Sequence, residues 1–113
     1  MPKFMLLIRG GDPDGQISPE EMQAIIQKYV AWSQNLQNTG KLEASEKLCD
    51  DGRLVSVKNG KIVDGPFTET KEAVGGYFLV NAADYTEACK MARDCPVLER
   101  AGVVEVRKLD FQD

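Results

Sequence analysis

The sequence predicts a single α+β domain built on an antiparallel β-sheet that carries both of its helices on one face. Its 113 residues suit one ordinary domain spanning residues 1–113. Apolar runs with the two-residue period of strands alternate along the chain with longer stretches that have the period of helices. An Asn-Gly pair between two β-branched runs adds a hairpin insert.

The first third of the chain is expected to form strand, helix and strand. Residues 3–9 are apolar on both alternating faces, as in a central strand. Ser18 is suited to cap a helix that starts at Pro19, and Gly40 is suited to end it. Residues 42–48 alternate well enough for a second strand. The residues expected on the buried side of the helix are Met22, Ile25, Ile26, Tyr29, Ser33 and Leu36, with Trp32 packed beside them.

The hairpin is the clearest local signal. Asn and Gly tolerate the left-handed backbone of a two-residue type I′ turn, which places the turn at residues 59–60. A two-residue turn also sets the register, so that Val57 pairs with Ile62 and Val55 pairs with Asp64. Asp64 is therefore expected on the apolar face of the hairpin.

The last third is expected to form strand, helix and strand again. Residues 75–81 are apolar on both faces, residues 84–96 have a cap at Asp84 and a stop at Pro96, and residues 102–109 form the final strand. The residues expected to be buried on this second helix are Tyr85, Ala88, Cys89 and Ala92. The full order is that of a ferredoxin-like split βαβ sheet, in which right-handed connections place both helices on one face.

The opposite face of such a sheet is left uncovered. Its two central strands would display Met5, Leu7, Tyr77 and Leu79 there. Soluble monomers rarely expose an apolar patch of more than a few hundred Å². We therefore expect a homodimer in which two copies pack sheet against sheet about a two-fold axis.

Composition excludes several classes of function. A net charge of −4 with scattered basic residues argues against a nucleic-acid partner. The longest apolar run near the start is too short to cross a membrane, and no signal peptide is recognisable. Three cysteines lack zinc-ligand spacing and there is no histidine, so neither a metal site, a cofactor nor a His-based catalytic triad is expected. The cysteines are expected to be small buried side chains in a cytoplasmic protein.

A candidate site follows from the segment "VDGPFTETKE" at residues 63–72. An aspartate on an apolar hairpin face is a local conflict of the kind found at functional positions, which makes Asp64 the candidate catalytic base. Gly65-Pro66 ends the strand and leaves Phe67 free to cover the carboxylate. Arg9, Tyr77 and Lys71 complete the predicted ligand-binding set, together with Phe67.

Each of these residues also has a purely structural explanation. Aspartate before glycine is a common turn residue whose carboxylate accepts hydrogen bonds from nearby backbone amides. Arg9 at the end of a strand is suited to pair with Glu105 or with an aspartate. Tyr77 lies where a side chain would be shared between the core and a subunit interface. The sequence leaves these alternatives open.

The motifs "DGPFTETKE" and "GGYFLV", with "MLLI", "GKLEASEKL" and "EACKMARDCP", resemble the DGPF-domain branch of the YciI-like proteins over nearly the whole chain. The resemblance implies a dimeric α/β barrel of ferredoxin-like subunits, mostly without established activity. It also implies a genomic association with extracytoplasmic-function sigma factors. Other YciI-like relatives carry a histidine paired with an aspartate in a proposed active site. Without any histidine, only Asp64 of that pair carries over.

Three functions are consistent with these observations. The first is a homodimer that binds a small molecule in a cleft near the DGPF motif, with regulation as one use of that binding. The second is a cofactor-independent lyase or isomerase acting on a small substrate, such as an aromatic one, with Asp64 as general base. The third is a protein-interaction subunit linked to sigma-factor regulation.

Overall fold

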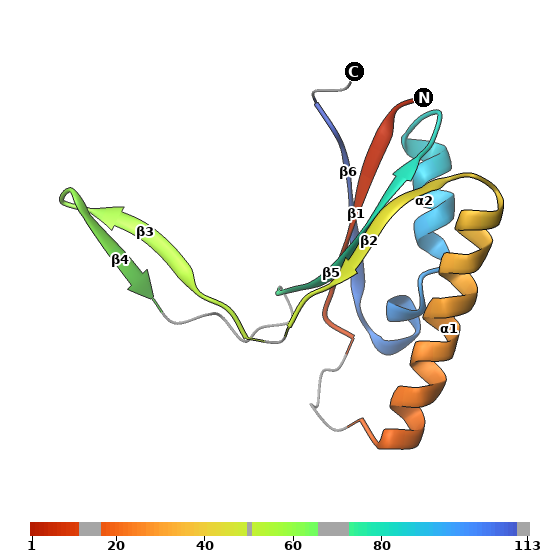
Figure 1. The fold of residues 1–113 in the computed structure, drawn as a ribbon, viewed down its shortest axis with the longest axis horizontal. Helices are drawn as coiled ribbons and strands as arrows, with labels where there is room; N and C mark the ends of the chain where they lie inside the picture. The colour runs from red at the N-terminus through yellow and green to blue at the C-terminus, as the bar shows by residue number, and fades with distance from the viewer. Residues whose placement is uncertain (12–16, 50, 66–72, 111–113) are drawn as a thin grey trace.

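Four strands form an antiparallel sheet in the order β2-β5-β1-β6, shown in Figure 1. The computed structural model describes residues 1–11, 17–49, 51–65 and 73–110. The strands are β1 (Lys3–Arg9), β2 (Leu42–Lys47), β5 (Val74–Asn81) and β6 (Val103–Lys108). This order and the antiparallel pairing of every neighbour confirm the predicted ferredoxin-like α+β fold, the subunit fold of dimeric α/β barrels.

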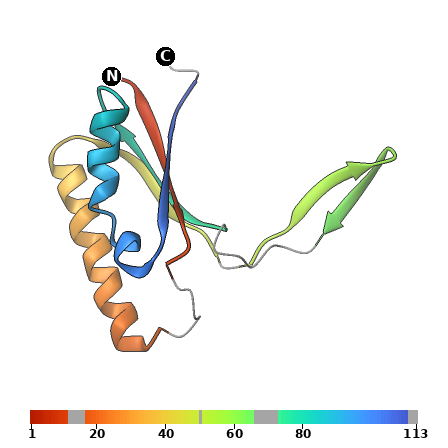
Figure 2. The same cartoon turned by 180° about the vertical axis from the view of Figure 1, so that it is seen from behind.

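Both helices, α1 (Pro19–Asn38) and α2 (Tyr85–Arg93), cover the same face of the sheet, as Figures 1 and 2 show from opposite sides. The predicted caps are present. The Ser18 hydroxyl accepts a hydrogen bond from the Glu21 amide at 3.1 Å, and the Asp84 carboxylate accepts one from the Glu87 amide at 2.9 Å. These bonds satisfy amides that the first helical turn leaves without partners.

The chain after α2 differs from the prediction. Pro96 does not merely end the preceding helix; it begins a 3-10 helix, η1 (Pro96–Arg100). Its Val97 is buried and lies against Gly11 and Gly102, where an added Cβ would collide with the valine side chain. Gly11, in the loop after β1, therefore has a packing role, and Arg100 donates a hydrogen bond to its carbonyl at 2.9 Å.

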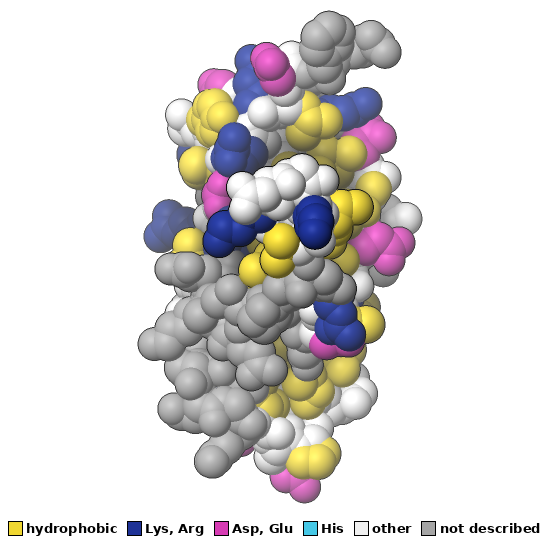
Figure 3. All heavy atoms as spheres, turned by 90° about the vertical axis from the view of Figure 1, so that its left-hand side faces the viewer, with side chains coloured by type: hydrophobic (Ala, Val, Ile, Leu, Met, Phe, Trp, Pro, Cys, Tyr) yellow, Lys and Arg dark blue, Asp and Glu magenta, His cyan; other side chains and the backbone are white. Residues whose placement is uncertain are grey.

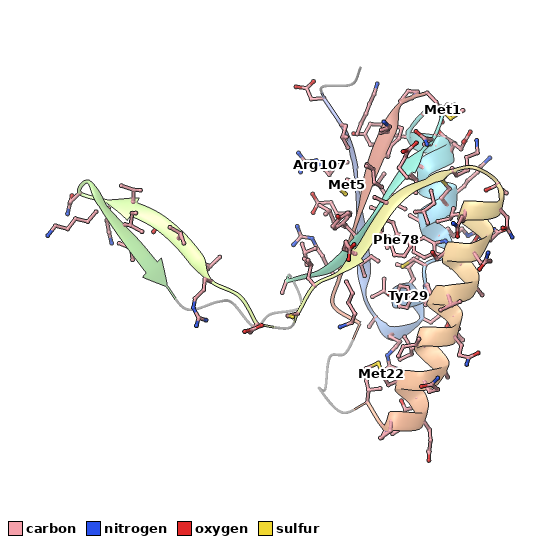
Figure 4. The ribbon with its side chains drawn as sticks, viewed as in Figure 1. Met1, Met5, Met22, Tyr29, Phe78 and Arg107 are labelled. Atoms are coloured by element: carbon pink, nitrogen blue, oxygen red, sulfur yellow. The ribbon has the colours of Figure 1, made fainter. Side chains whose placement is uncertain are left out.

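The core lies between the sheet and the helices. It is formed by Phe4, Leu6, Ile8, Trp32, Leu36, Phe78, Val80, Ala82, Ala88, Ala92, Cys95 and Val97. The ring centroids of Trp32 and Phe78 lie 4.4 Å apart, and the indole nitrogen donates to the Met91 carbonyl at 3.1 Å. Trp32 is thus a packing residue, as predicted. In Figure 4, Phe78 and Tyr29 lie on the helix side of the sheet, and Met5 and Arg107 lie on the other side.

Both helices bury narrower faces than their sequences predicted. Met22 and Ile26 are exposed, because the first turns of α1 extend past the end of the sheet (Figure 1). On α2 only Ala88 and Ala92 are buried among the four expected residues. Tyr85 and Cys89 share a neighbouring stripe that solvent reaches, although the Tyr85 ring makes an edge contact with Phe4 at 4.9 Å.

The strands β3 (Leu54–Lys58) and β4 (Lys61–Gly65) form a separate two-stranded sheet. Asn59 and Gly60 have φ angles of 53° and 77°, which confirms the type I′ turn, and Val55 pairs with Asp64 as the register required. The hairpin extends away from the sheet on the side opposite the helices (Figures 1 and 2). No residue of it belongs to the core described above.

The Leu6→Ala variant should be less stable than the wild type by about 2–5 kcal/mol, because Leu6 is fully buried and the truncation leaves a cavity. The matched control is Val30→Ala on the exposed side of α1, for which we expect a change within about 0.5 kcal/mol. Urea unfolding at equal protein concentrations measures both. Equal losses of unfolding free energy in Leu6→Ala and Val30→Ala would contradict a core that lies only between the sheet and the inner face of α1.

Candidate functional site

The sheet face opposite the helices, here called the open face, combines apolar and charged side chains. Strand register places on it Met5, Leu7 and Arg9 of β1, Tyr77 and Leu79 of β5, Glu105 and Arg107 of β6, and Ala44 and Glu46 of β2. Figure 3 looks onto this side, with the hairpin pointing toward the viewer, and shows hydrophobic atoms bordered by basic and acidic ones. This mixture is typical of a ligand-binding or subunit-binding surface.

Glu105 is the centre of the charged cluster on the open face. Arg9 donates to its Oε1 from NH2 at 2.7 Å and from Nε at 3.1 Å. Arg107 donates to Oε2 at 3.0 Å. One carboxylate therefore holds two guanidinium groups, which belong to adjacent strands of the sheet. This confirms Glu105 as a partner of Arg9, one of the two explanations that the sequence allowed.

The same contacts change the acidity of Glu105. The hydrogen bond from Arg107, followed by that from Arg9, holds the pKa of the carboxyl group below its ordinary value. A carboxylate that accepts bonds from cations is stabilised in its charged form. The cluster is therefore expected to persist at a lower pH than a glutamate without such donors would allow.

Two consecutive glycines lie beside this cluster at the start of β5. Gly76 is a packing requirement, because an added Cβ would lie 3.0 Å from the Glu46 carbonyl oxygen of β2. Gly75 is exposed, and its Cβ would meet only the Ile8 carbonyl oxygen at 3.9 Å. The pairing register shifts here, between Ile8 and Arg9. Such bulges redirect neighbouring side chains, and this one lies at Arg9.

The predicted site residues fall into three groups. Arg9 and Tyr77 lie on the open face, where Tyr77 pairs with Leu7, two residues before Arg9. Asp64 lies in β4, which belongs to the hairpin and not to the four-stranded sheet. Phe67 and Lys71 fall outside the residues that the structure describes. Within the described chain, the candidate base and the candidate cation are therefore on different sheets.

Sequence reasoning missed Arg107. The signal was present, because Glu105 and Arg107 are separated by one residue on the last strand and so share a face. Their face could be assigned only once the pairing of β6 with β1 was known. The described residues contain no group of three or more Cys, Asp or Glu side chains arranged to hold a metal ion.

The cysteines differ from the prediction that all three are buried. Cys49 and Cys89 are exposed, and only Cys95 is buried. Burial raises the pKa of the Cys95 thiol, whose sulfur lies 3.9 Å from the Tyr29 hydroxyl oxygen. Burial also raises the pKa of Tyr29, and the nearby Cys95 adds to that effect. Both groups are held in their neutral forms and act as core residues.

A groove of about 390 Å³ lies on the helix side of the molecule, away from the open face. Its walls are Trp32, Asn35, Leu36, Thr39, Lys41, Glu87, Lys90, Met91 and Asp94. Lys41 and Glu87 form an ion pair across it at 3.2 Å, and both side chains are about one third exposed. Arg9 and Tyr77, the predicted site residues whose side chains the structure describes, do not line this groove. Among the described residues, no helix is long and apolar enough to cross a membrane.

The connectivity, the one-sided helix layer and the inserted hairpin define an α+β protein with the subunit fold of dimeric α/β barrels. The chain belongs to the YCII-related domain family, whose profile matches residues 3–110. It is 30% identical over 97 residues to the uncharacterized protein R00369 of Rhizobium meliloti strain 1021, covering 81% of this chain and 78% of the relative.

Among the similar solved structures is 5-chloro-2-hydroxyhydroquinone dehydrochlorinase (TftG) from Burkholderia phenoliruptrix AC1100 in complex with 2,5-dihydroxybenzoquinone. The two chains are 14% identical, with a TM-score of 0.48. The likeness covers 99% of this chain and 96% of the other.

A thiol reagent such as 5,5′-dithiobis(2-nitrobenzoate) should label Cys49 and Cys89 rapidly in the folded protein. Cys95 should react only after unfolding in denaturant, because it is buried and the reactive thiolate is disfavoured there. Absorbance counts the thiols, and a Cys95→Ala variant identifies the slow one. Rapid labelling of all three cysteines would contradict the packing around Cys95.

Replacing Glu105 by glutamine should lower the melting temperature at neutral pH, because both guanidiniums lose their carboxylate. The folded-state pKa of Glu105 is depressed, so its stabilisation is complete above the unfolded pKa and is lost as pH falls through the folded pKa. The difference between the wild type and Glu105→Gln should therefore shrink in acid.

The control for this measurement is Glu46→Gln. Glu46 lies on the same face, and its carboxylate forms no ion pair with the other described residues. Its effect on melting temperature should be smaller at neutral pH. A difference between the wild type and Glu105→Gln that stays constant down to strongly acidic pH would refute the role assigned to the cluster.

Proposed function

We propose that this protein is a homodimer that binds a small molecule carrying an anionic group and an apolar body, such as an aromatic ring, on the open face of each subunit. The observation that carries the proposal is the cluster of Arg9, Glu105 and Arg107 within an apolar sheet face that also holds Tyr77. Such a site can serve regulation by binding alone and does not require catalysis.

The surface area of the chain supports the homodimer. A compact monomer of 12.5 kDa is expected to expose about 6,200 Å². This chain exposes 8188 Å², an excess of about 2,000 Å² over that expectation. Obligate homodimers bury about 2,000–5,000 Å² in total over both partners. The excess surface area of two chains, taken together, lies within the range that such an interface buries.

The ligand class follows from the donors of Arg107. Its guanidinium carries five N–H donors, and among the described residues the hydrogen bond that it makes runs from NH1 to Glu105 at 3.0 Å. The side chain is 69% exposed in the single chain, so the remaining donors are open to a ligand held between the open faces of two copies. Arginine binds carboxylates well because its donors match their geometry. Met5, Leu7 and Leu79 would contact the apolar part of the ligand.

Catalysis by Asp64 stays a prediction. The residue belongs to β4, and in the described chain no observation brings it to Arg9 or Tyr77. If a lyase or isomerase substrate is identified, Asp64→Asn should abolish turnover, and unchanged turnover would exclude Asp64 as the base. A sigma-factor-related partner also stays a prediction that rests on the family resemblance alone.

Benzoate is a suitable probe, with benzyl alcohol as the uncharged analogue of the same ring. We expect saturable shifts of the Tyr77 and Arg107 amide resonances with benzoate, and weaker shifts with benzyl alcohol. Arg107→Ala should weaken benzoate binding about tenfold, the effect of losing a charge-assisted hydrogen bond. Lys108→Ala is the matched control, because it removes the same charge from the neighbouring residue on the opposite face.

Two results would count against the proposal. In the first, benzoate causes no saturable change on the open face at millimolar concentration. In the second, Arg107→Ala and Lys108→Ala weaken benzoate binding equally, which would indicate attraction by overall charge and not by a site. Sedimentation velocity at micromolar concentration tests the homodimer separately, through its mass.

A further inference from the structure

The hairpin of β3 and β4 has one mainly apolar face that no other described part of the chain covers. Register places Val55, Val57 and Ile62 on this face, and Leu54, Ser56, Lys58, Lys61 and Val63 on the other. The three apolar side chains are 66%, 69% and 76% exposed. An isolated two-stranded hairpin is at best marginally stable in water, and it needs packing on one face to be held. The apolar face is therefore a contact surface.

The direction of the hairpin indicates what it contacts. It extends from the same side of the sheet as the open face, opposite the helices (Figures 1 and 3). Sheets that pack face to face lie about 10 Å apart, and the five residues of β3 span about 17 Å at 3.3 Å each. A copy seated on the open face would therefore lie within reach of the hairpin, which is longer than the gap between the sheets.

Charge complementarity favours a second copy of the chain as the partner. Residues 53–65 carry three basic side chains, Arg53, Lys58 and Lys61, and one acidic side chain, Asp64. The whole chain has a net charge of −4, so the remainder of each chain is acidic. A basic hairpin is attracted to the acidic body of another copy, and such attraction orients and accelerates association. Lys58 and Lys61 lie on the face opposite Val57, so they favour the approach of a second copy without forming part of the apolar contact.

From these three observations we propose that the β3–β4 hairpin is an arm that docks on a second copy of the chain through Val55, Val57 and Ile62. The inference rests on the proposed homodimer and adds a specific contact to it. In a two-fold dimer each subunit would give one arm and receive one. Register also puts position 64 on the docking face, so the start of the DGPF segment would lie at the boundary between the two subunits.

Hydrogen exchange on the full-length protein tests the docking directly. In the dimer, the β3–β4 amides that pair across the hairpin should exchange at least about a hundredfold more slowly than in a Val57→Asp variant, because a docked arm opens less often. A mass measurement on the same sample establishes the oligomeric state. Near-ultraviolet circular dichroism of the buried Trp32 confirms that the variant's core is intact.

A matched pair of variants tests which face docks. Val57→Asp and Ser56→Asp introduce the same charge at adjacent positions of one strand, but on opposite faces. Val57→Asp should raise the dimer dissociation constant at least about tenfold, the effect of placing a charge in an apolar contact. Ser56→Asp should change it less than about threefold. Sedimentation velocity over a concentration series measures both constants.

Failure of this inference can be told from failure of the proposed function. A stable wild-type dimer whose arm amides exchange within seconds would overturn the docking while leaving the homodimer intact, and the arm would then be available to another protein. Equal effects of the two aspartate variants would overturn the assigned face. A wild-type monomer at micromolar concentration would overturn both the homodimer and the docking.

Discussion

The structure depends on the burial of one face of a four-stranded sheet beneath two helices. Phe4, Leu6 and Val80 are fully buried there. Because side chains alternate along a strand, burying this set forces Met5 and Leu79 onto the opposite face. Neither α1 nor α2 covers that face (Figures 1 and 2), although it carries apolar residues. The uncovered face is therefore a direct consequence of how the core is made.

The charged cluster of the open face follows from the same arrangement. The antiparallel pairing of β1 with β6 sets Arg9, Glu105 and Arg107 side by side, and the bulge beside Arg9 adjusts the end of its strand. Glu105 links the two guanidiniums, which would otherwise repel each other. Charged side chains at the end of an apolar surface give it both affinity for an apolar body and a means of orienting it.

The hairpin extends the uncovered surface beyond the sheet. Its turn and register are determined by Asn59 and Gly60, without help from the rest of the fold. The residues of its apolar face all lie in the same short segment. The surface that covers those residues lies outside that segment. A local sequence can specify a hairpin because its contacts are between near neighbours. What covers the hairpin depends on contacts between distant surfaces, including those of a second chain.

The sequence by itself determined the order of the strands and helices, the caps at Ser18 and Asp84, and the hairpin register, because each depends on residues close together in the chain. Only the tertiary structure decided that the start of α1 extends past the sheet, that Cys89 is exposed and that Arg107 joins Arg9 through Glu105. Burial and ion pairing depend on which distant elements meet, and on how far each extends. The hydrophobic periodicity within a single helix or strand does not show which distant elements it meets or how far it extends past them.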